Sequence, residues 1–369
     1  MAKRKALFMI CLLAVAFGLT ALVAVLAERE EKSEGLLCVT SFYPVQLLAE
    51  SVAEGAEGVT VRNLTESHSG CIHDYTLTTR DMRLLSEAEL FLINGGEMEL
   101  FLEKAAAEYK DLEIVDTSKG YDFLEGVEHS HDHGAEEEAH SAESCTDPTH
   151  NHEDEHLAES CTDPTHDHEE DVAICTDPTH DHEEGDHEED AHAGHSDAVN
   201  AHIWMDIDGY LLQLSRVEEA FVAADPAQAE LYRANAEECR KELTKLKEEY
   251  AAAREALSGK ETVVFHEGFV YLLNMLGIES VHCLAMDSDT QIAAGEAAEI
   301  MEECKRHNIA VLFAEADYVQ AVEDTFAKEL SGKVIALDPV TGGSGTGVSY
   351  YCEIMRHNLD CIKQAYGVR

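Results

Sequence analysis

Positive charge is scarce in this sequence. Its 369 residues include 26 Lys and Arg against 75 Asp and Glu, which gives a formal net charge of −49. Affinity for a phosphate backbone comes largely from Lys and Arg, so the composition argues against a nucleic-acid partner and against binding to anionic lipid headgroups. Cations are the natural partners of such a chain. A hydrophobic content of 45% is enough for a core and excludes disorder of the whole chain.

Long hydrophobic runs are also scarce, and the one exception stands at the start. Lys3, Arg4 and Lys5 precede an uncharged apolar run over residues 6–27. This pattern is typical of an export signal, and the run is also long enough to cross a bilayer uncleaved. We expect residues 1–27 to be a signal peptide or an N-terminal anchor. The remainder would then be exported, either periplasmic or anchored on the outer face of the cytoplasmic membrane.

Lys and Arg are absent altogether between residues 128 and 200, where 25 acidic residues and 14 of the 21 His lie. The hexapeptide Cys-Thr-Asp-Pro-Thr-His occurs there three times, beginning at Cys145, Cys161 and Cys175. The segment has no apolar pattern that could offset the entropy cost of folding. We interpret residues 128–198 as a disordered insert that attracts metal ions. A merely solvated acidic linker is the alternative.

Strand and helix patterns alternate on both sides of the insert. Expected strands cover 36–41, 59–64, 90–93, 112–115, 262–265, 310–314 and 334–337, and expected helices cover 43–53, 79–88, 100–109, 208–223, 270–276, 295–307, 319–330 and 350–366. This alternation predicts an α/β fold with mainly parallel sheets flanked by helices.

A long helix is predicted between two lobes. Asp225 and Pro226 are a start signal for a helix that continues to about residue 258, and a helix of that length could act as a rigid spine. The expected domains are an N-terminal lobe over 36–223 that includes the insert, a linker helix over 225–258 and a C-terminal lobe over 261–369.

Four polar residues stand at loop or strand-end positions of this pattern. His266 and Asp338 each follow an expected strand, His73 lies between a strand and a helix, and His202 lies between the insert and a helix. Ligands of open α/β sheets bind beyond the carboxyl ends of strands, and loops carry many sites. Taken singly, a His in such a position is more often an ordinary surface or core residue than a ligand. Their shared placement makes all four candidate site residues.

Five motifs resemble, in the same order, those of one protein family. They are Thr-Ser-Phe-Tyr-Pro at 40–44, Gly-Cys-Ile-His-Asp-Tyr at 70–75, Ala-His-Ile-Trp-Met-Asp at 201–206, Val-Val-Phe-His-Glu-Gly-Phe at 263–269 and Leu-Asp-Pro at 337–339. Over residues 36–367 the sequence is similar to the zinc- and manganese-binding solute-binding proteins of bacterial ABC importers, of the high-affinity zinc uptake type. A His-rich acidic insert just before the second His motif is also typical of the zinc members.

The resemblance implies two α/β lobes bridged by one long helix, with metal held in the cleft between the lobes. The metal ligands it implies are His73, His202, His266 and Asp338. Glu315 also matches a family position near the site, and we expect it to lie outside the ligand set. At the first motif Cys71 and Ile72 replace the usual Glu-Pro, so a contribution that Glu makes in some members is lost.

The function that the resemblance implies is an extracytoplasmic receptor that captures Zn²⁺ and delivers it to the importer's membrane permease. Such a receptor is not an enzyme, and we expect a monomer. Three His with one carboxylate suit tetrahedral Zn²⁺, with bonds of about 2.0–2.2 Å. Mn²⁺ prefers more oxygen ligands and is the less expected cargo. A manganese or iron receptor of the same family is therefore the alternative.

Two other classes of protein are considered. A surface zinc metalloenzyme could also use three His with an open position, but the motifs supply no clear general base or substrate pocket. The segment His-Glu-Asp-Glu-His at 152–156 matches a metalloprotease motif, yet it lacks the apolar helix that holds such a site. No phosphate-binding P-loop motif occurs, so the chain is not the importer's ATPase. A surface metal sponge or adhesin-like protein would use the insert as its main functional part.

Overall fold

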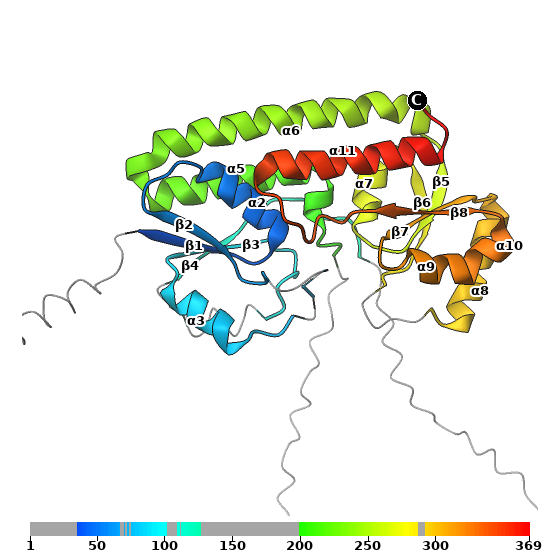
Figure 1. Ribbon diagram of the computed structural model, residues 1–369, viewed down its shortest axis with the longest axis horizontal. Coiled ribbons are helices and arrows are strands. Elements are labelled where there is room, and N and C mark those ends of the chain that lie inside the picture. Colours follow the sequence, from blue (N-terminus) through cyan, green and yellow to red (C-terminus); the bar gives the residue numbers. More distant parts are fainter. Residues whose placement is uncertain are drawn as a thin grey trace, which may run out of the picture. The chain divides into compact units, whose positions relative to one another are not determined.

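Two four-stranded sheets, one from each half of the chain, organise this computed structural model (Figure 1). The structure describes residues 35–66, 70, 72–73, 75–101, 109–110, 112–126, 199–286 and 292–369. The first sheet has the strand order β2-β1-β3-β4 and the second β6-β5-β7-β8, and every pairing in both sheets is parallel. The part of the chain around the first sheet is named the N-terminal lobe, and the part around the second sheet is named the C-terminal lobe. The predicted α/β fold with mainly parallel sheets is confirmed.

The strands are short and their inner members are apolar. They are β1 (Leu36–Thr40), β2 (Val59–Asn63), β3 (Leu90–Ile93), β4 (Glu113–Asp116), β5 (Glu261–Val264), β6 (Glu279–Cys283), β7 (Val311–Glu315) and β8 (Lys333–Leu337). Every residue of β3 is buried, because helices cover both faces of a parallel sheet. In the second sheet Glu315 pairs with Leu337 at the carboxyl ends of β7 and β8. His266, Glu315 and Asp338 stand at or just after the carboxyl ends of β5, β7 and β8, and therefore at this same edge of the sheet.

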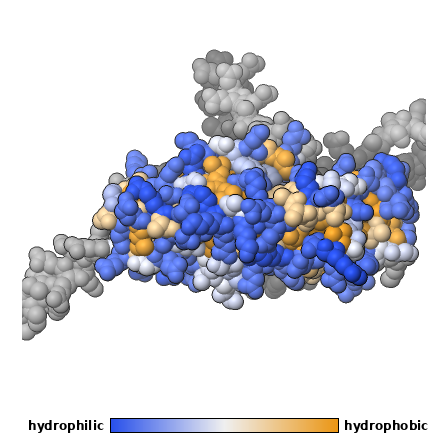
Figure 2. Space-filling model, turned by 90° about the horizontal axis from the view of Figure 1, so that it is seen from above, coloured by the Kyte–Doolittle hydropathy of each residue, from blue (hydrophilic) through white to orange (hydrophobic). Residues whose placement is uncertain are grey.

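The helices connect the strands and also form a layer of their own. They are α2 (Tyr43–Val52), α3 (Thr79–Glu87), α5 (Ile207–Ala224), α6 (Ala229–Leu257), α7 (Phe269–Met275), α8 (Ala294–His307), α9 (Val319–Val322), α10 (Lys328–Leu330) and α11 (Gly347–Ala365). Short 3₁₀ turns cover Ile203–Met205 and Pro226–Gln228. The face seen in Figure 2 is mostly hydrophilic, with apolar side chains in separate small patches.

The predicted long helix is α6, which has 29 residues and a length of about 43 Å at ~1.5 Å per residue. Figure 1 shows it running over both lobes. One detail of the prediction was wrong, because Pro226 opens a separate 3₁₀ turn and α6 begins only at Ala229. Asp225 does not cap α6. Its carboxylate instead accepts hydrogen bonds from the Tyr232 hydroxyl at 2.8 Å and the Gln228 amide at 2.6 Å.

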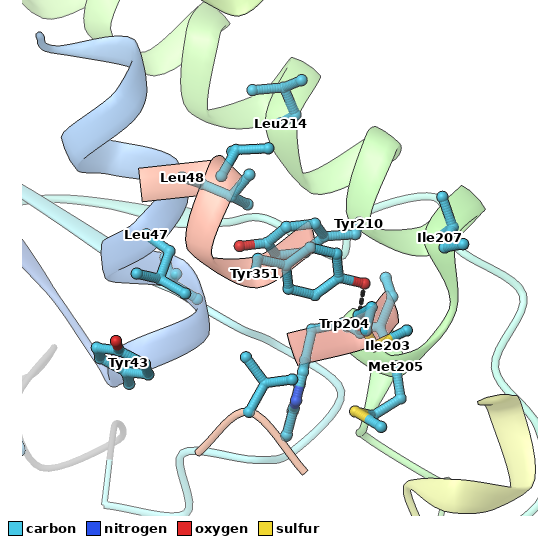
Figure 3. Packing of buried hydrophobic residues seen from close by; sticks show 14 of the residues in the cluster. Tyr43, Leu47, Leu48, Ile203, Trp204, Met205, Ile207, Tyr210, Leu214 and Tyr351 are labelled. Atoms are coloured by element: carbon cyan, nitrogen blue, oxygen red, sulfur yellow. Dashed lines mark hydrogen bonds between the residues drawn. The ribbon is translucent and has the colours of Figure 1, made fainter. Parts of the chain in front are cut away.

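The last helix, α11, packs on α6 and α2 after the chain has left the second sheet. The Tyr250 hydroxyl of α6 donates to the Met355 carbonyl at 2.7 Å, and the rings of Tyr210 and Tyr351 stack with centroids 3.9 Å apart. Tyr351 also donates to the Trp204 carbonyl at 2.7 Å (Figure 3). A continuous core therefore joins the helix layer to the segment that contains His202.

Two elements of the C-terminal lobe differ from the prediction. Strand β6 was missed, because its sequence Glu-Ser-Val-His-Cys is only partly buried and has no apolar run. The single helix predicted over 319–330 is divided into α9, a π-helical segment Glu323–Ala327 and α10. Val322 of α9 and Phe326 of the π-helical segment are fully buried in the core of this lobe.

Several predictions lie outside the described residues. These are the N-terminal segment 1–27, the insert 128–198 and most of the helix expected over 100–109. Glu125 and Val199, on either side of the insert, form an isolated antiparallel bridge. Within the described ranges no helix is long and apolar enough to cross a membrane.

Candidate metal centre

Three of the four predicted ligands come together. The ring centroids of His73 and His202 lie 5.5 Å apart, and those of His202 and His266 lie 4.7 Å apart. His73 stands between β2 and α3, His202 precedes the 3₁₀ turn Ile203–Met205, and His266 follows β5 by two residues. His202 and His266 are buried, and His73 is half-buried. The cluster therefore draws imidazoles from both lobes.

Gly268 permits this close approach. A Cβ atom at that position would lie 2.8 Å from Cε1 of His266 and 3.1 Å from Cβ and Cδ2 of His202. The first distance is below ordinary van der Waals contact, so any side chain would push the rings aside. A small residue here is thus a requirement of the cluster. The motif contained Gly268, but its spacing alone could not indicate this role.

His202 is held by Asn200. Its Nδ1 atom lies 2.9 Å from Oδ1 of Asn200, and its backbone N–H donates to the same oxygen at 3.2 Å. The carboxylate of Glu267 lies 3.9 Å from Nδ1, which is beyond hydrogen-bond distance but close enough to act electrostatically. Glu267 was in a quoted motif and Asn200 directly precedes another. Neither was recognised as a site residue, because the sequence shows neither the direction of the Asn200 side chain nor the approach of Glu267 to His202.

His266 has different surroundings. Burial, with a smaller effect from nearby His73, lowers the pKa of His266 to about 3. The ring is therefore neutral at pH 7, which is the form that binds metals. Its Nδ1 accepts the backbone N–H of Gly268 at 3.2 Å, and its Nε2 lies 3.4 Å from a carboxylate oxygen of Glu315. Glu315 is closer to the cluster than the sequence suggested.

Asp338 lies directly after β8, at the same sheet edge. Its carboxylate accepts the backbone N–H of Val340 at 2.7 Å, and burial raises the pKa of the carboxyl group. The next residue, Pro339, accepts the indole N–H of Trp204 at 2.8 Å. The Trp204 ring in turn lies 5.0 Å from that of His202. Asp338 is linked to the histidine cluster through these two residues, and its role as a ligand stays a prediction.

The donor types suit zinc, although the side chains are not yet arranged as a cage. Among the described residues no three His, Cys, Asp or Glu side chains have the mutual geometry of a metal site. Zinc bonds of about 2.0–2.2 Å need the ring nitrogens to converge on one point. The rings of His202 and His266 meet edge to face, with centroids 4.7 Å apart.

The fold is that of the two-lobed solute-binding proteins. The structure is similar to that of Zn(II)-bound AdcA from Streptococcus pneumoniae, with a TM-score of 0.62 and 19% identity over 90% of this chain and 57% of that chain. The family described as zinc-uptake complex component A periplasmic matches residues 38–365. The chain belongs to this family.

Two curated relatives have similar sequences over most of the chain. Zinc-binding protein AdcA of Streptococcus pyogenes serotype M3 is 25% identical, over 98% of this chain and 61% of the relative. High-affinity zinc uptake system protein ZnuA of Bacillus subtilis is 24% identical, over 93% of this chain and 91% of the relative. The chain thus spans about 61% of the length of the streptococcal relative and nearly all of the Bacillus one.

Proposed function

We propose that this protein is an extracytoplasmic receptor that captures Zn²⁺ and delivers it to the membrane permease of an ABC importer. One observation carries the proposal: His73, His202 and His266, from two lobes, lie with ring centroids 4.7 and 5.5 Å apart. Neutral imidazoles are ligands that suit Zn²⁺. The relatives are named as zinc-binding and zinc uptake proteins, which supports the same cargo here.

We take Asp338 as the fourth ligand. A carboxylate completes a tetrahedron around Zn²⁺, and Asp338 follows β8 at the sheet edge where β7 ends in Glu315. Manganese is the second candidate cargo, because the carboxylates of Glu267 and Glu315 lie 3.9 and 3.4 Å from imidazole nitrogens of the cluster. Manganese prefers such oxygen ligands.

The proposed work is capture and release, with no covalent step and no catalysis. His266 has a pKa of about 3, so it need not lose a proton before it binds a metal at pH 7. Because ligands come from both lobes, the ion would fix how the two halves of the site meet. Release to a permease would then depend on separating His266 from His202.

We also propose the domain roles that the sequence suggests. Residues 1–27 would direct export or anchor the chain on the outer face of the cytoplasmic membrane. Residues 36–223 and 261–369 would be the two lobes of a monomer, with α6 (Ala229–Leu257) between them. The insert over 128–198 would bind several Zn²⁺ ions weakly, because its His and Cys side chains are ligands and its acidic residues raise the local cation concentration.

Metal analysis of two proteins tests the proposal. One is the full chain, and the other has residues 128–198 replaced by a short linker, which the bridge between Glu125 and Val199 makes feasible. Isothermal titration should find one tight Zn²⁺ in both proteins and additional weak Zn²⁺ only in the full chain.

Three results would contradict this assignment. Loss of the tight site from the shortened protein would mean that the insert supplies the ligands, as in a metal sponge. Tighter binding of Mn²⁺ than of Zn²⁺ would favour the manganese receptor. Zinc-dependent hydrolysis of esters or hydration of CO₂ would favour a metalloenzyme.

A further inference from the structure

Asn200 is buried at the meeting point of the two lobes, with 1% of its surface exposed. Its backbone N–H donates to the Leu124 carbonyl at 2.9 Å, and its own carbonyl accepts the hydroxyl of Tyr271 at 2.8 Å. The side-chain Nδ2 donates to the Glu267 carbonyl at 3.0 Å. The side-chain Oδ1 faces both the backbone N–H and the Nδ1 atom of His202. One amide therefore contacts a metal-ligand candidate of one lobe and the backbone of the other.

The orientation of this amide follows from its backbone partners. The Glu267 carbonyl can only accept, so the atom facing it must be the NH₂ group. The His202 backbone N–H can only donate, so the atom facing it must be the oxygen. Two independent backbone groups thus fix an assignment that side-chain partners alone would leave ambiguous.

The tautomer of His202 follows in turn. An amide oxygen has no proton to give, so the 2.9 Å contact requires His202 to carry its proton on Nδ1. In the neutral ring the lone pair then lies on Nε2. The carboxylate of Glu267, 3.9 Å from Nδ1, also favours a proton on that side of the ring.

We propose that Asn200 is a positioning residue that fixes His202 in the Nδ1–H tautomer, so that Nε2 is the only nitrogen of this ring able to bind metal. The inference rests on the proposed function, because it assigns a part to Asn200 in the same site. The amide also joins His202 to the backbone of Glu267, the residue after His266. Asn200 thereby sets both the proton position and the spacing between the two halves of the site.

Three substitutions separate these two effects. Asn200→Ala removes the acceptor for His202 and the donor to Glu267. Asn200→Asp keeps an acceptor for Nδ1–H but places a carboxylate oxygen against the Glu267 carbonyl, so the link between the lobes is lost. Asn235→Ala is the matched control, because Asn235 also donates to backbone carbonyls, of Val52 and Glu54, yet its side chain contacts none of the cluster.

The first measurement uses the metal-free full chain labelled with ¹⁵N-histidine. The His202 signal is identified as the one that His202→Gln removes, and its ¹⁵N shifts report which nitrogen carries the proton. We expect the Nδ1–H tautomer in the unsubstituted protein and in Asn200→Asp, and a mixture in Asn200→Ala. A proton on Nε2 in the unsubstituted protein would overturn the proposal. This readout needs no zinc, so it stands apart from the proposed function.

The second measurement is zinc affinity by competition with a chromophoric chelator. Partners that orient metal ligands change affinity by about 10–100-fold, and we expect a loss in that range for Asn200→Ala, a smaller loss for Asn200→Asp and no change for Asn235→Ala. Unchanged affinity and tautomer in Asn200→Ala would overturn the proposal. If Asn200→Ala does not fold, Asn200→Asp becomes the deciding variant. Loss of the Nδ1–H tautomer of His202 in Asn200→Asp would contradict the proposal. Absence of any tight zinc site in the unsubstituted protein would instead refute the proposed function.

Discussion

The two halves of the site hold their histidines in different ways, although the two lobes share one sheet order. In the N-terminal half Nδ1 of His202 donates to Asn200, which leaves the lone pair on Nε2. In the C-terminal half Nδ1 of His266 accepts the Gly268 N–H, so the proton of the neutral ring lies on Nε2, facing Glu315. If the proposed site is correct, the first ring already has its lone pair on Nε2, whereas the second has a proton there.

The different tautomers of the two rings predict how the proposed site would capture a cation. For Nε2 of His266 to bind a cation, the neutral ring must change tautomer: its proton moves from Nε2 to Nδ1, and the contact between Nδ1 and the Gly268 N–H must open. His202 needs no such change. We therefore expect metal binding to rearrange the C-terminal half more than the N-terminal half, and the following predictions break or sharpen that contrast.

Removal of a ring should have the largest effect. His73→Ala, His202→Ala and His266→Ala each remove one nitrogen ligand, so we expect zinc affinity to fall by more than the ~100-fold that outer partners reach. Competition with a chelator measures it on the shortened protein. His307→Ala is the control, because that ring contacts Glu261 and lies outside the cluster. A variant that keeps full affinity would remove its histidine from the site.

Gly268→Ala should come next, because its Cβ would strike both rings that the contrast concerns. We expect a loss of stability of about 1–3 kcal/mol, the usual cost of overpacking, and zinc affinity about tenfold lower as the rings separate. Urea unfolding and chelator competition measure the two effects. In Gly295→Ala, the matched control, no atom of the described residues beyond its neighbours and its own helix backbone lies within 4 Å of the new Cβ. Equal behaviour of both variants would mean that the rings do not depend on Gly268.

The two carboxylates of the C-terminal half should differ. We expect Asp338→Asn to weaken zinc binding by about tenfold, since water can fill a tetrahedral position. Glu315→Gln should cost less, because we place Glu315 beside His266 and not on the metal. Titration of both variants under one buffer condition gives the comparison. A larger loss for Glu315→Gln would make Glu315 the fourth ligand and displace Asp338 from that position.

The decrease of the free energy of unfolding at acidic pH should depend on His266. The pKa of His266 is about 3 in the folded protein against an ordinary 6.5. As pH falls, the unfolded chain therefore binds a proton at this ring before the folded protein does. Stability from the neutral buried ring is therefore present above pH 6.5 and lost as pH falls toward 3. For the metal-free protein we expect a loss on the order of 2 kcal/mol between pH 6.5 and 5. Urea unfolding should show a flatter slope for His266→Gln, and an unchanged slope would contradict the assignment.

Glu99, in the N-terminal lobe, should make the free energy of unfolding change with pH in the opposite direction. Burial raises the pKa of Glu99 to about 7 from an ordinary 4.5, although the N–H groups of Asn94 and Gly95 donate to the carboxylate. The folded state holds this proton more tightly, so stability is greatest below pH 4.5 and is lost as pH rises through 7. Glu99→Gln should flatten the decline between pH 5 and 8 in the same unfolding series. A decline equal to that of the unsubstituted protein would show that Glu99 does not titrate there.

Periodicity and apolar runs predicted most of the fold, and physical reasons explain the exceptions. Strands such as β3 are read easily, because a buried parallel strand is apolar at every position. Strand β6 pairs with β5 at the sheet edge, where Glu279 and Ser280 remain compatible with water, so no apolar run marks it. The helix over 319–330 is divided by a π-helical segment that contains the buried Phe326, and no local pattern of the sequence marks this division.

The sequence indicated that the three histidines would lie together, and their role as ligands stays a prediction; it did not indicate which residues support them. His73, His202 and His266 stood at strand ends or loops, and the family motifs named them together. The role of Asn200 depends on the Glu267 carbonyl, which lies 67 residues along the chain. The position of Glu315 beside His266 likewise follows from the pairing of β5 with β7. Such contacts arise from folding, and spacing in the sequence does not determine them.

Trp204 gives the site a built-in optical reporter. It is the only tryptophan of the chain, and its ring packs edge to face on Phe42 with centroids 4.8 Å apart. The indole also lies 5.0 Å from the ring of His202 and donates across to Pro339 of the other lobe. All intrinsic tryptophan emission therefore originates beside the histidine cluster. Tryptophan fluorescence, excited at wavelengths that the 12 tyrosines do not absorb, therefore reports on this one position of the unlabelled protein.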